Sequence, residues 1–141
     1  MIGVLDGRLM VQTRSVHLTL ATLEAASAFL DSRTGPAPFG ALAVVNGDAG
    51  VLPEAIRIKQ REFITRLLGA GAYMATLVYG DTVHASTMRS MGRMMLLRQP
   101  RLSHHTDLAA AATALAGPLG MRVEDIVDAV SRIQRELPHT P

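Results

Sequence analysis

Two short, unbroken apolar runs constrain the fold of this chain more than any other feature. The first run, FGALAVV, covers residues 39–45, and the second, AYMATLVY, covers residues 72–79. Turn-forming residues bound the first run on both sides, and a glycine pair precedes the second. An apolar run of this length without polar alternation is typical of a strand that is covered on both faces. The two runs therefore predict neighbouring strands in the middle of one sheet.

The start of the chain reads as a β-hairpin. In the segment IGVLDGRLMVQT, the pair Asp6-Gly7 lies between two apolar stretches. Asp and Gly tolerate the positive φ angles of a type I′ turn, which joins two antiparallel strands. We expect Leu9 and Val11 on one face of the second strand and Met10 on the other.

The remaining elements follow from helical spacing and from capping residues. Pro100 is expected to end the third helix, and residues 101–104 are expected to form a short strand. Gly117-Pro118 and Gly120 are expected to break the chain after the fourth helix. Helices are predicted to begin after Thr19, at Pro53, after Asp81 and after Thr106, and a last helix covers residues 123–137.

This order of elements predicts an α/β fold with a mixed sheet of four to five strands. The N-terminal hairpin supplies antiparallel strands, the core is largely parallel, and the helices are expected to cover mainly one face. We assign residues 1–120 to one domain and residues 121–141 to an extra C-terminal helix and tail. The wide apolar stripe of that helix either packs back on the sheet or pairs with a second copy of the chain.

Composition narrows the class of protein. The chain has 141 residues, 48% of them hydrophobic, and no cysteine. One domain is expected, and disulfide scaffolds, zinc-thiolate sites and thiol catalysis are excluded. Every apolar run is shorter than the ~18 residues of a membrane span, and residues 1–5 do not resemble a signal peptide. We therefore expect a cytoplasmic protein without a membrane span.

The charges do not predict nucleic-acid binding. Fourteen basic residues face twelve acidic ones, and Lys59 is the only lysine among them. A nucleic-acid interface needs a concentrated basic stripe, usually with aromatic residues, whereas these arginines are dispersed among acids. We attribute the excess of arginine to a GC-rich genome, which favours arginine codons, and phosphate-backbone binding is the weaker alternative.

The order and spacing of the elements resemble the STAS domains, the fold of anti-sigma factor antagonists, and more closely the STAS-like proteins related to the lipid-binding SEC14 group. The resemblance covers residues 2–117 and rests on four segments: IGVLDGRLMVQT, FGALAVV with GDAG, AYMATLVYGDTVHASTMRSM, and RLSHHTDLAAAATALA. It implies a regulatory module that binds a protein partner. In antagonists of the anti-sigma type, phosphorylation of a Ser or Thr in the loop after the central strand acts as the switch.

That loop departs from the family pattern. Residues 46–55 contain no Ser or Thr, so a phosphorylation switch is not expected there. Asp48 either supplies a fixed negative charge in its place or is an ordinary turn residue. We expect the partner to bind at Asp48 and at the start of the following helix, through Glu54, Arg57 and Arg61, and we expect the protein to be a homodimer.

A second hypothesis, from the SEC14-like resemblance, is a carrier or sensor of an apolar small molecule. Methionine adapts to irregular apolar surfaces, and a methionine stripe also serves as ordinary core packing. The candidate groove is a single stripe formed by His84, Met88, Met91 and Met95.

Enzymatic chemistry finds little support. His104 and His105, near Asp107, form the only cluster with ligand chemistry. Adjacent residues of a strand point to opposite faces, so the two histidines are not expected to hold one metal ion. No phosphate loop and no nucleophile elbow is present. We expect no enzyme, cofactor or metal, although a minimal enzyme using His84 or the His104-His105 pair is a third hypothesis.

Overall fold

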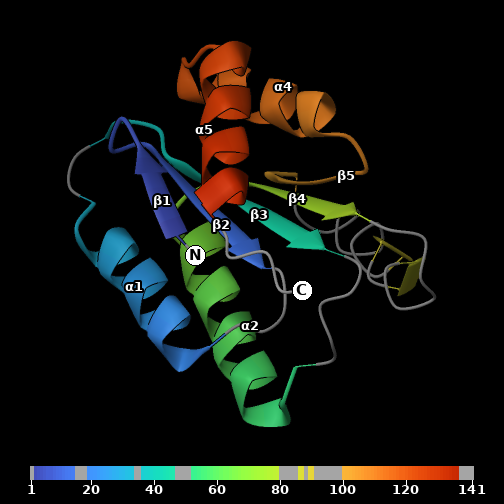
Figure 1. The fold of residues 1–141 in the computed structure, drawn as a ribbon. Coiled ribbons are helices and arrows are strands. Elements are labelled where there is room, and N and C mark those ends of the chain that lie inside the picture. The colour runs from blue at the N-terminus through green and yellow to red at the C-terminus, as the bar shows by residue number, and fades with distance from the viewer. Residues whose placement is uncertain are drawn as a thin grey trace.

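A mixed β-sheet with helices on both sides forms the described part of the molecule (Figure 1). The structure, a computed structural model, describes residues 2–14, 19–33, 36–46, 52–79, 86–87, 89–90 and 100–136. Its strands are β1 (Ile2–Leu5), β2 (Leu9–Arg14), β3 (Gly40–Asn46), β4 (Tyr73–Tyr79) and β5 (Leu102–His105). Its helices are α1 (Leu20–Asp31), α2 (Glu54–Gly69), α4 (Leu108–Leu119) and α5 (Val123–Glu136). The predicted α/β class is confirmed.

The strands lie in the order β1-β2-β3-β4-β5. β1 and β2 pair antiparallel, and every later neighbour pairs parallel. The register of β3 and β4 runs from Gly40 opposite Tyr73 to Asn46 opposite Tyr79. The two apolar runs are therefore neighbouring strands, with β3 in the middle of the sheet, as their composition predicted.

The hairpin turn has the predicted backbone conformation. Asp6 and Gly7 have φ angles of 52° and 62°, the pair of positive values that a type I′ turn requires. The backbone N–H of Arg8 donates to the carbonyl of Leu5 over 3.0 Å. The ladder itself begins with Leu5 opposite Leu9, so Arg8, the last residue of the turn, has no partner in the ladder.

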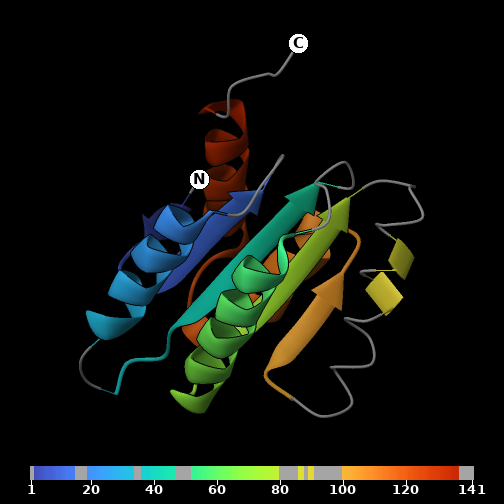
Figure 2. The ribbon, with the colours of Figure 1, turned by 90° about the horizontal axis from the view of Figure 1, so that it is seen from below.

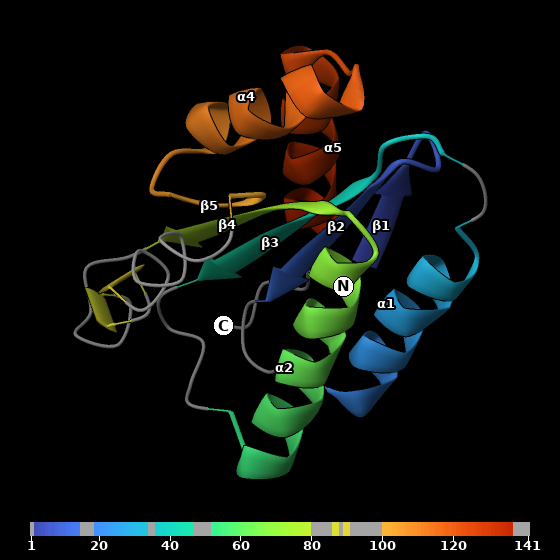
Figure 3. The ribbon, with the colours of Figure 1, turned by 180° about the vertical axis from the view of Figure 1, so that it is seen from behind.

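Helices cover both faces of the sheet, which differs from the expectation of mainly one covered face. Figures 1 and 3 show α1 and α2 on one side and α4 and α5 on the other. Two hydrophobic clusters correspond to the two layers, and Met10 belongs to one while Leu9 and Val11 belong to the other. Strands that are apolar on both faces need cover on both faces, and the helices after β5 provide the second layer.

α5 packs back on its own sheet. Ile126 and Val130 are 0% exposed and lie in one hydrophobic cluster with residues of β2, β3, β4 and α4. A Cβ at Gly3 would come within 2.6 Å of the Cδ1 of Ile133, so the absence of a side chain at this position lets α5 approach β1 closely. Of the two alternatives for the apolar stripe of this helix, the structure shows packing on the sheet.

The ends of α4 differ in detail from the sequence prediction. The cap is Asp107 rather than Thr106, and its Oδ2 accepts the N–H of Ala110 over 3.1 Å. The helix continues through Pro118, because a proline in the last turn removes only one backbone hydrogen bond. It ends at Gly120, whose φ of 64° is the left-handed conformation typical of a helix C-terminus.

Among the described helices, none combines the length and the apolar composition that crossing a bilayer would require.

Candidate functional site

The amino-terminal half of α2 stands away from the body of the sheet. Figures 1 and 3 show α2 sloping from the sheet, with its Glu54 end the more distant one. At the other end, Leu67 and Leu68 are buried in the core. Over residues 54–62 no side chain is buried, and only Ile56 and Gln60 are half-buried. A helix needs only one apolar face for packing, so this half presents a broad surface to solvent.

The predicted partner-binding residues on α2 form one exposed stripe. Glu54, Arg57 and Arg61 are all exposed, and the two arginines are one helical turn apart. Within the described residues, neither guanidinium takes part in an ion pair or a side-chain hydrogen bond. Ile58, which is 46% exposed, adds an apolar group beside them. Asp48, the fourth predicted residue, lies outside the described residues.

The other cations of α2 are engaged in ion pairs. Arg66 approaches Asp31 of α1 within 2.7 Å, and Lys59 approaches Glu62 within 3.7 Å. These four residues line an open groove of about 410 Å³ between α1 and α2. The cations on the α1-facing flank are thus paired within the chain, whereas the Arg57/Arg61 flank carries positive charge that the described residues leave unpaired.

The predicted ligand groove cannot be placed. His84, Met88, Met91 and Met95 all lie outside the residues whose side chains the structure describes.

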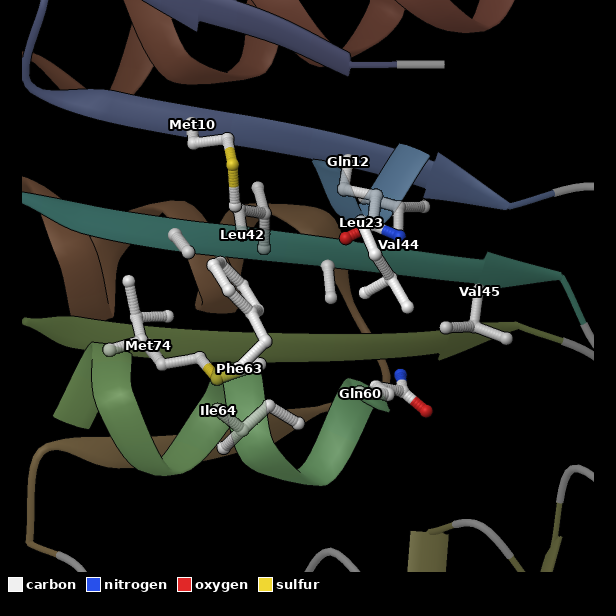
Figure 4. Close-up of a pocket in the computed structure, with 13 residues that line it drawn as sticks. Met10, Gln12, Leu23, Leu42, Val44, Val45, Gln60, Phe63, Ile64 and Met74 are labelled. Atoms are coloured by element: carbon white, nitrogen blue, oxygen red, sulfur yellow. The ribbon is translucent and has the colours of Figure 1, made fainter. Parts of the chain in front are cut away.

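A pocket of about 30 Å³ lies between the sheet and the helices α1 and α2. Figure 4 shows Met10 and Met74 at one end of it and Gln12 and Gln60 toward the carboxyl ends of the strands. A pocket of this volume holds about one water molecule and is far smaller than the ~300 Å³ of a typical small-molecule site.

The two adjacent histidines of β5 point to opposite faces, as predicted. His104 pairs with Thr76 in the ladder, and its Nδ1 hydrogen-bonds the Thr76 hydroxyl on the face that carries Leu102 and α2. His105 lies on the α4 face, near Asp107. The described residues contain no group of three or more potential metal-ligating side chains close enough to hold an ion.

A polar cluster at the carboxyl end of β4 was not found from the sequence. The hydroxyl of Tyr79 is hydrogen-bonded to the side chain of Gln134 on α5. Burial, and secondly the negative charge of Asp107, raise the pKa of this hydroxyl, and the hydrogen bond to Gln134 opposes them. Burial lowers the pKa of His105, and the charge of Asp107 opposes this. The Nε2 of His105 is buried and has no hydrogen-bond partner in the described part of the chain.

This cluster joins β4, β5, α4 and α5 rather than forming an open site. Tyr79 packs partly buried in the α4/α5 cluster, and no pocket described above includes it. The alternation along β4 could have placed Tyr79 on the same face as Leu77, but nothing in the sequence pairs it with Gln134. The arrangement supports a packing role more directly than a catalytic one.

Comparisons with known proteins identify no family. No family model, no curated protein and no solved structure matches the chain. The resemblance to STAS domains stays a prediction, and the arguments for function rest on the surface of α2.

Proposed function

We propose that this chain is a non-catalytic, STAS-like regulatory module of the cytoplasm that acts by binding another protein, and that it works as a homodimer. The partner binds the outer stripe of α2 formed by Glu54, Arg57, Ile58 and Arg61, a surface called the α2 stripe below. The observation that supports this proposal is the unpaired positive charge of Arg57 and Arg61 on the half of α2 that stands away from the sheet.

The chemistry of the α2 stripe fits protein recognition. Arginine presents a planar fork of donors that pairs with a carboxylate in two hydrogen bonds, and it is enriched among the residues that dominate binding energy. Ile58 supplies apolar area between the charges. Because Arg57 and Arg61 have no partner to give up within the described chain, binding an acidic partner breaks no intramolecular ion pair. The charges also steer encounter and orient the partner.

Charge reversal tests this proposal. The double variant Arg57→Glu/Arg61→Glu replaces two exposed side chains, and a glutamate in the first turn of α2 interacts favourably with the helix dipole. We therefore expect the melting temperature to stay nearly unchanged. Affinity capture from the native cells, quantified by mass spectrometry, should show partner recovery at least about tenfold lower, which corresponds to ~1.4 kcal/mol of binding free energy.

A matched control distinguishes the effect of changing the α2 stripe from the effect of changing the net charge of the protein. Arg132 and Arg135 are exposed on α5, on the opposite side of the sheet. The variant Arg132→Glu/Arg135→Glu makes the same change in charge and should retain the partner. Equal loss in both variants would show that only net charge matters. Unfolding of the α2 variant would show that its arginines are structural, and either result contradicts the proposal.

A further inference from the structure

The α2 stripe presents its charges in a fixed order. From the amino end of the helix the charged residues are Glu54, Arg57 and Arg61, one negative charge followed by two positive ones. Successive charges are three and four residues apart, so they lie on one face of the helix. All three are exposed, and within the described residues none of them takes part in an ion pair. A surface with such an order distinguishes one end of a partner from the other.

The α2 stripe faces away from the packed sides of its helix. Figure 2 shows α1 and α2 side by side on one face of the sheet, α1 beneath β1 and β2 and α2 beneath β3 and β4. Phe63 lines both the pocket under the sheet and the groove toward α1, whereas no residue of the α2 stripe lines either of them. The helix therefore packs on the sheet and faces α1 through other residues than those of the stripe.

The partner segment that fits this surface is a helix. A bound extended segment needs backbone hydrogen bonds, which a sheet edge supplies and the outside of a helix does not. A helix satisfies its own backbone groups and presents side chains at the same three- and four-residue spacing as α2. Two of its carboxylates can therefore meet Arg57 and Arg61, and a basic side chain one turn away can meet Glu54.

The direction of the partner helix follows from the helix dipole. Acidic side chains are stabilised near the amino end of a helix, and basic side chains near its carboxyl end. A partner helix that carries two acids and then a base agrees with this preference. Its acids meet Arg61 and Arg57 and its base meets Glu54 only when it runs antiparallel to α2. The parallel arrangement would need the base first, against the dipole of the partner helix.

We propose that the α2 stripe binds an α-helix of another protein, which runs antiparallel to α2 and presents two carboxylates followed by a basic residue at successive turns. This inference rests on the proposed function and names the chemistry of the partner. Because exposed ion pairs are individually weak, the three pairs set the orientation, and contact with the exposed Ile58 adds apolar area to the interface.

Reversing the one acid of the stripe tests the order of charges. In Glu54→Arg, the basic residue of the partner helix loses its counter-ion and meets a like charge. We therefore expect partner recovery in affinity capture from the native cells to fall at least about threefold. A partner that responds only to positive charge, such as a nucleic acid, would be recovered better, which would overturn the proposal. Glu136→Arg makes the same change of charge at an exposed residue of α5 and should leave recovery unchanged.

A second variant keeps this test independent of folding. Arginine in the first turn of α2 opposes the helix dipole, whereas glutamine is neutral there. Circular dichroism checks the fold of both variants, and Glu54→Gln decides if Glu54→Arg unfolds. We expect Glu54→Gln to lower recovery by less than Glu54→Arg does. Recovery equal to that of the unchanged chain in every folded variant would show that Glu54 faces no base, and would overturn the proposed order of charges.

Crosslinking from two positions tests the helix and its direction. Ile58 and Thr65 are exposed, uncharged and seven residues apart on one face of α2, a distance of about 10 Å. A photoreactive amino acid replaces each in turn, and mass spectrometry identifies the crosslinked residue of the partner. In an antiparallel helix, the residue reached from Thr65 precedes the one reached from Ile58 by about seven positions. The reverse order, or a separation of about three positions as in an extended segment, would overturn the proposal.

The outcomes distinguish this inference from the proposed function. Crosslinks to another protein in the wrong order or with the wrong spacing would overturn the antiparallel helix, and would leave partner binding by the α2 stripe standing. The absence of crosslinks from both positions would overturn both. Crosslinks only to a second copy of this chain would also overturn both, because the proposed partner is another protein.

Discussion

The guanidinium of Arg101 donates a hydrogen bond to the carbonyl of Leu68 over 3.2 Å, and so ties the start of β5 to the last turn of α2. Arg8 makes a similar contact with the carbonyl of Leu119 at the end of α4, over 3.4 Å. The last carbonyl groups of a helix have no hydrogen-bond partner within the helix, and they form the negative end of the helix dipole. Part of the arginine content of this chain therefore serves to cap helices.

Replacing Arg101 should destabilise the fold. Arg101→Ala removes a charge-assisted hydrogen bond and a favourable interaction with the dipole of α2. We expect the free energy of unfolding to fall by about 1 kcal/mol, measured by urea denaturation. Arg122→Ala is the control, because its guanidinium is exposed and approaches Glu124 only at 3.7 Å. Equal stability of the two variants would show that the Leu68 contact contributes nothing.

The register of β3 and β4 can be tested by adding one carbon atom, the Cβ of an alanine, at Gly40. A Cβ built at Gly40 would lie 2.5 Å from the carbonyl oxygen of Tyr73, its partner in the ladder. Backbone cannot move aside as a flexible side chain can, so Gly40→Ala should cost roughly 2 kcal/mol or more of stability.

Gly69 provides the matched glycine for this experiment. It is the last residue of α2, and a Cβ there would meet nothing within 4 Å. Gly69→Ala should therefore leave stability unchanged or raise it by up to about 1 kcal/mol. A tolerated Gly40→Ala would mean that β3 and β4 do not pair in this register.

The half-buried His105 should make stability depend on pH. Its pKa is lowered in the folded chain, so below its ordinary value of about 6.5 the unfolded chain binds a proton that the folded chain does not. The contribution of His105 is complete above that value and declines as the pH falls toward its lowered pKa. The melting temperature should thus drop more between about pH 7.5 and pH 5.5 in the unchanged chain than in His105→Asn. Parallel curves would contradict this.

The sequence predicted the centre of the fold well because burial there leaves a simple pattern. A strand with apolar residues at consecutive positions is covered on both faces, and the short apolar runs at residues 39–45 and 72–79 with turn residues beside them identified β3 and β4. The turn at Asp6-Gly7 and the cap at Thr19, whose hydroxyl accepts the N–H of Thr22 over 3.2 Å, are also local. Each depends on a few adjacent residues, and for this reason both could be predicted from the local sequence.

Features that depend on distant residues were missed. The contacts of Arg101 with Leu68 and of Tyr79 with Gln134 join positions far apart in the chain. In neither pair does the spacing or the composition of the sequence indicate that the two residues are in contact. The cover on the second face was missed for a related reason, since the residues of α4 and α5 do not show which face of the sheet these helices pack against. Exposure of Arg57 and Arg61 was predicted from helical period alone.

The most direct test of partner binding at α2 is photocrosslinking in the native cells. A photoreactive amino acid in place of the exposed Ile58 lies between the two arginines of the α2 stripe. We predict a discrete heavier species on a denaturing gel, and its loss when Arg57→Glu and Arg61→Glu are added. The absence of any such species, or a species that forms equally well with both arginines reversed, would contradict the proposal that a protein partner binds the α2 stripe.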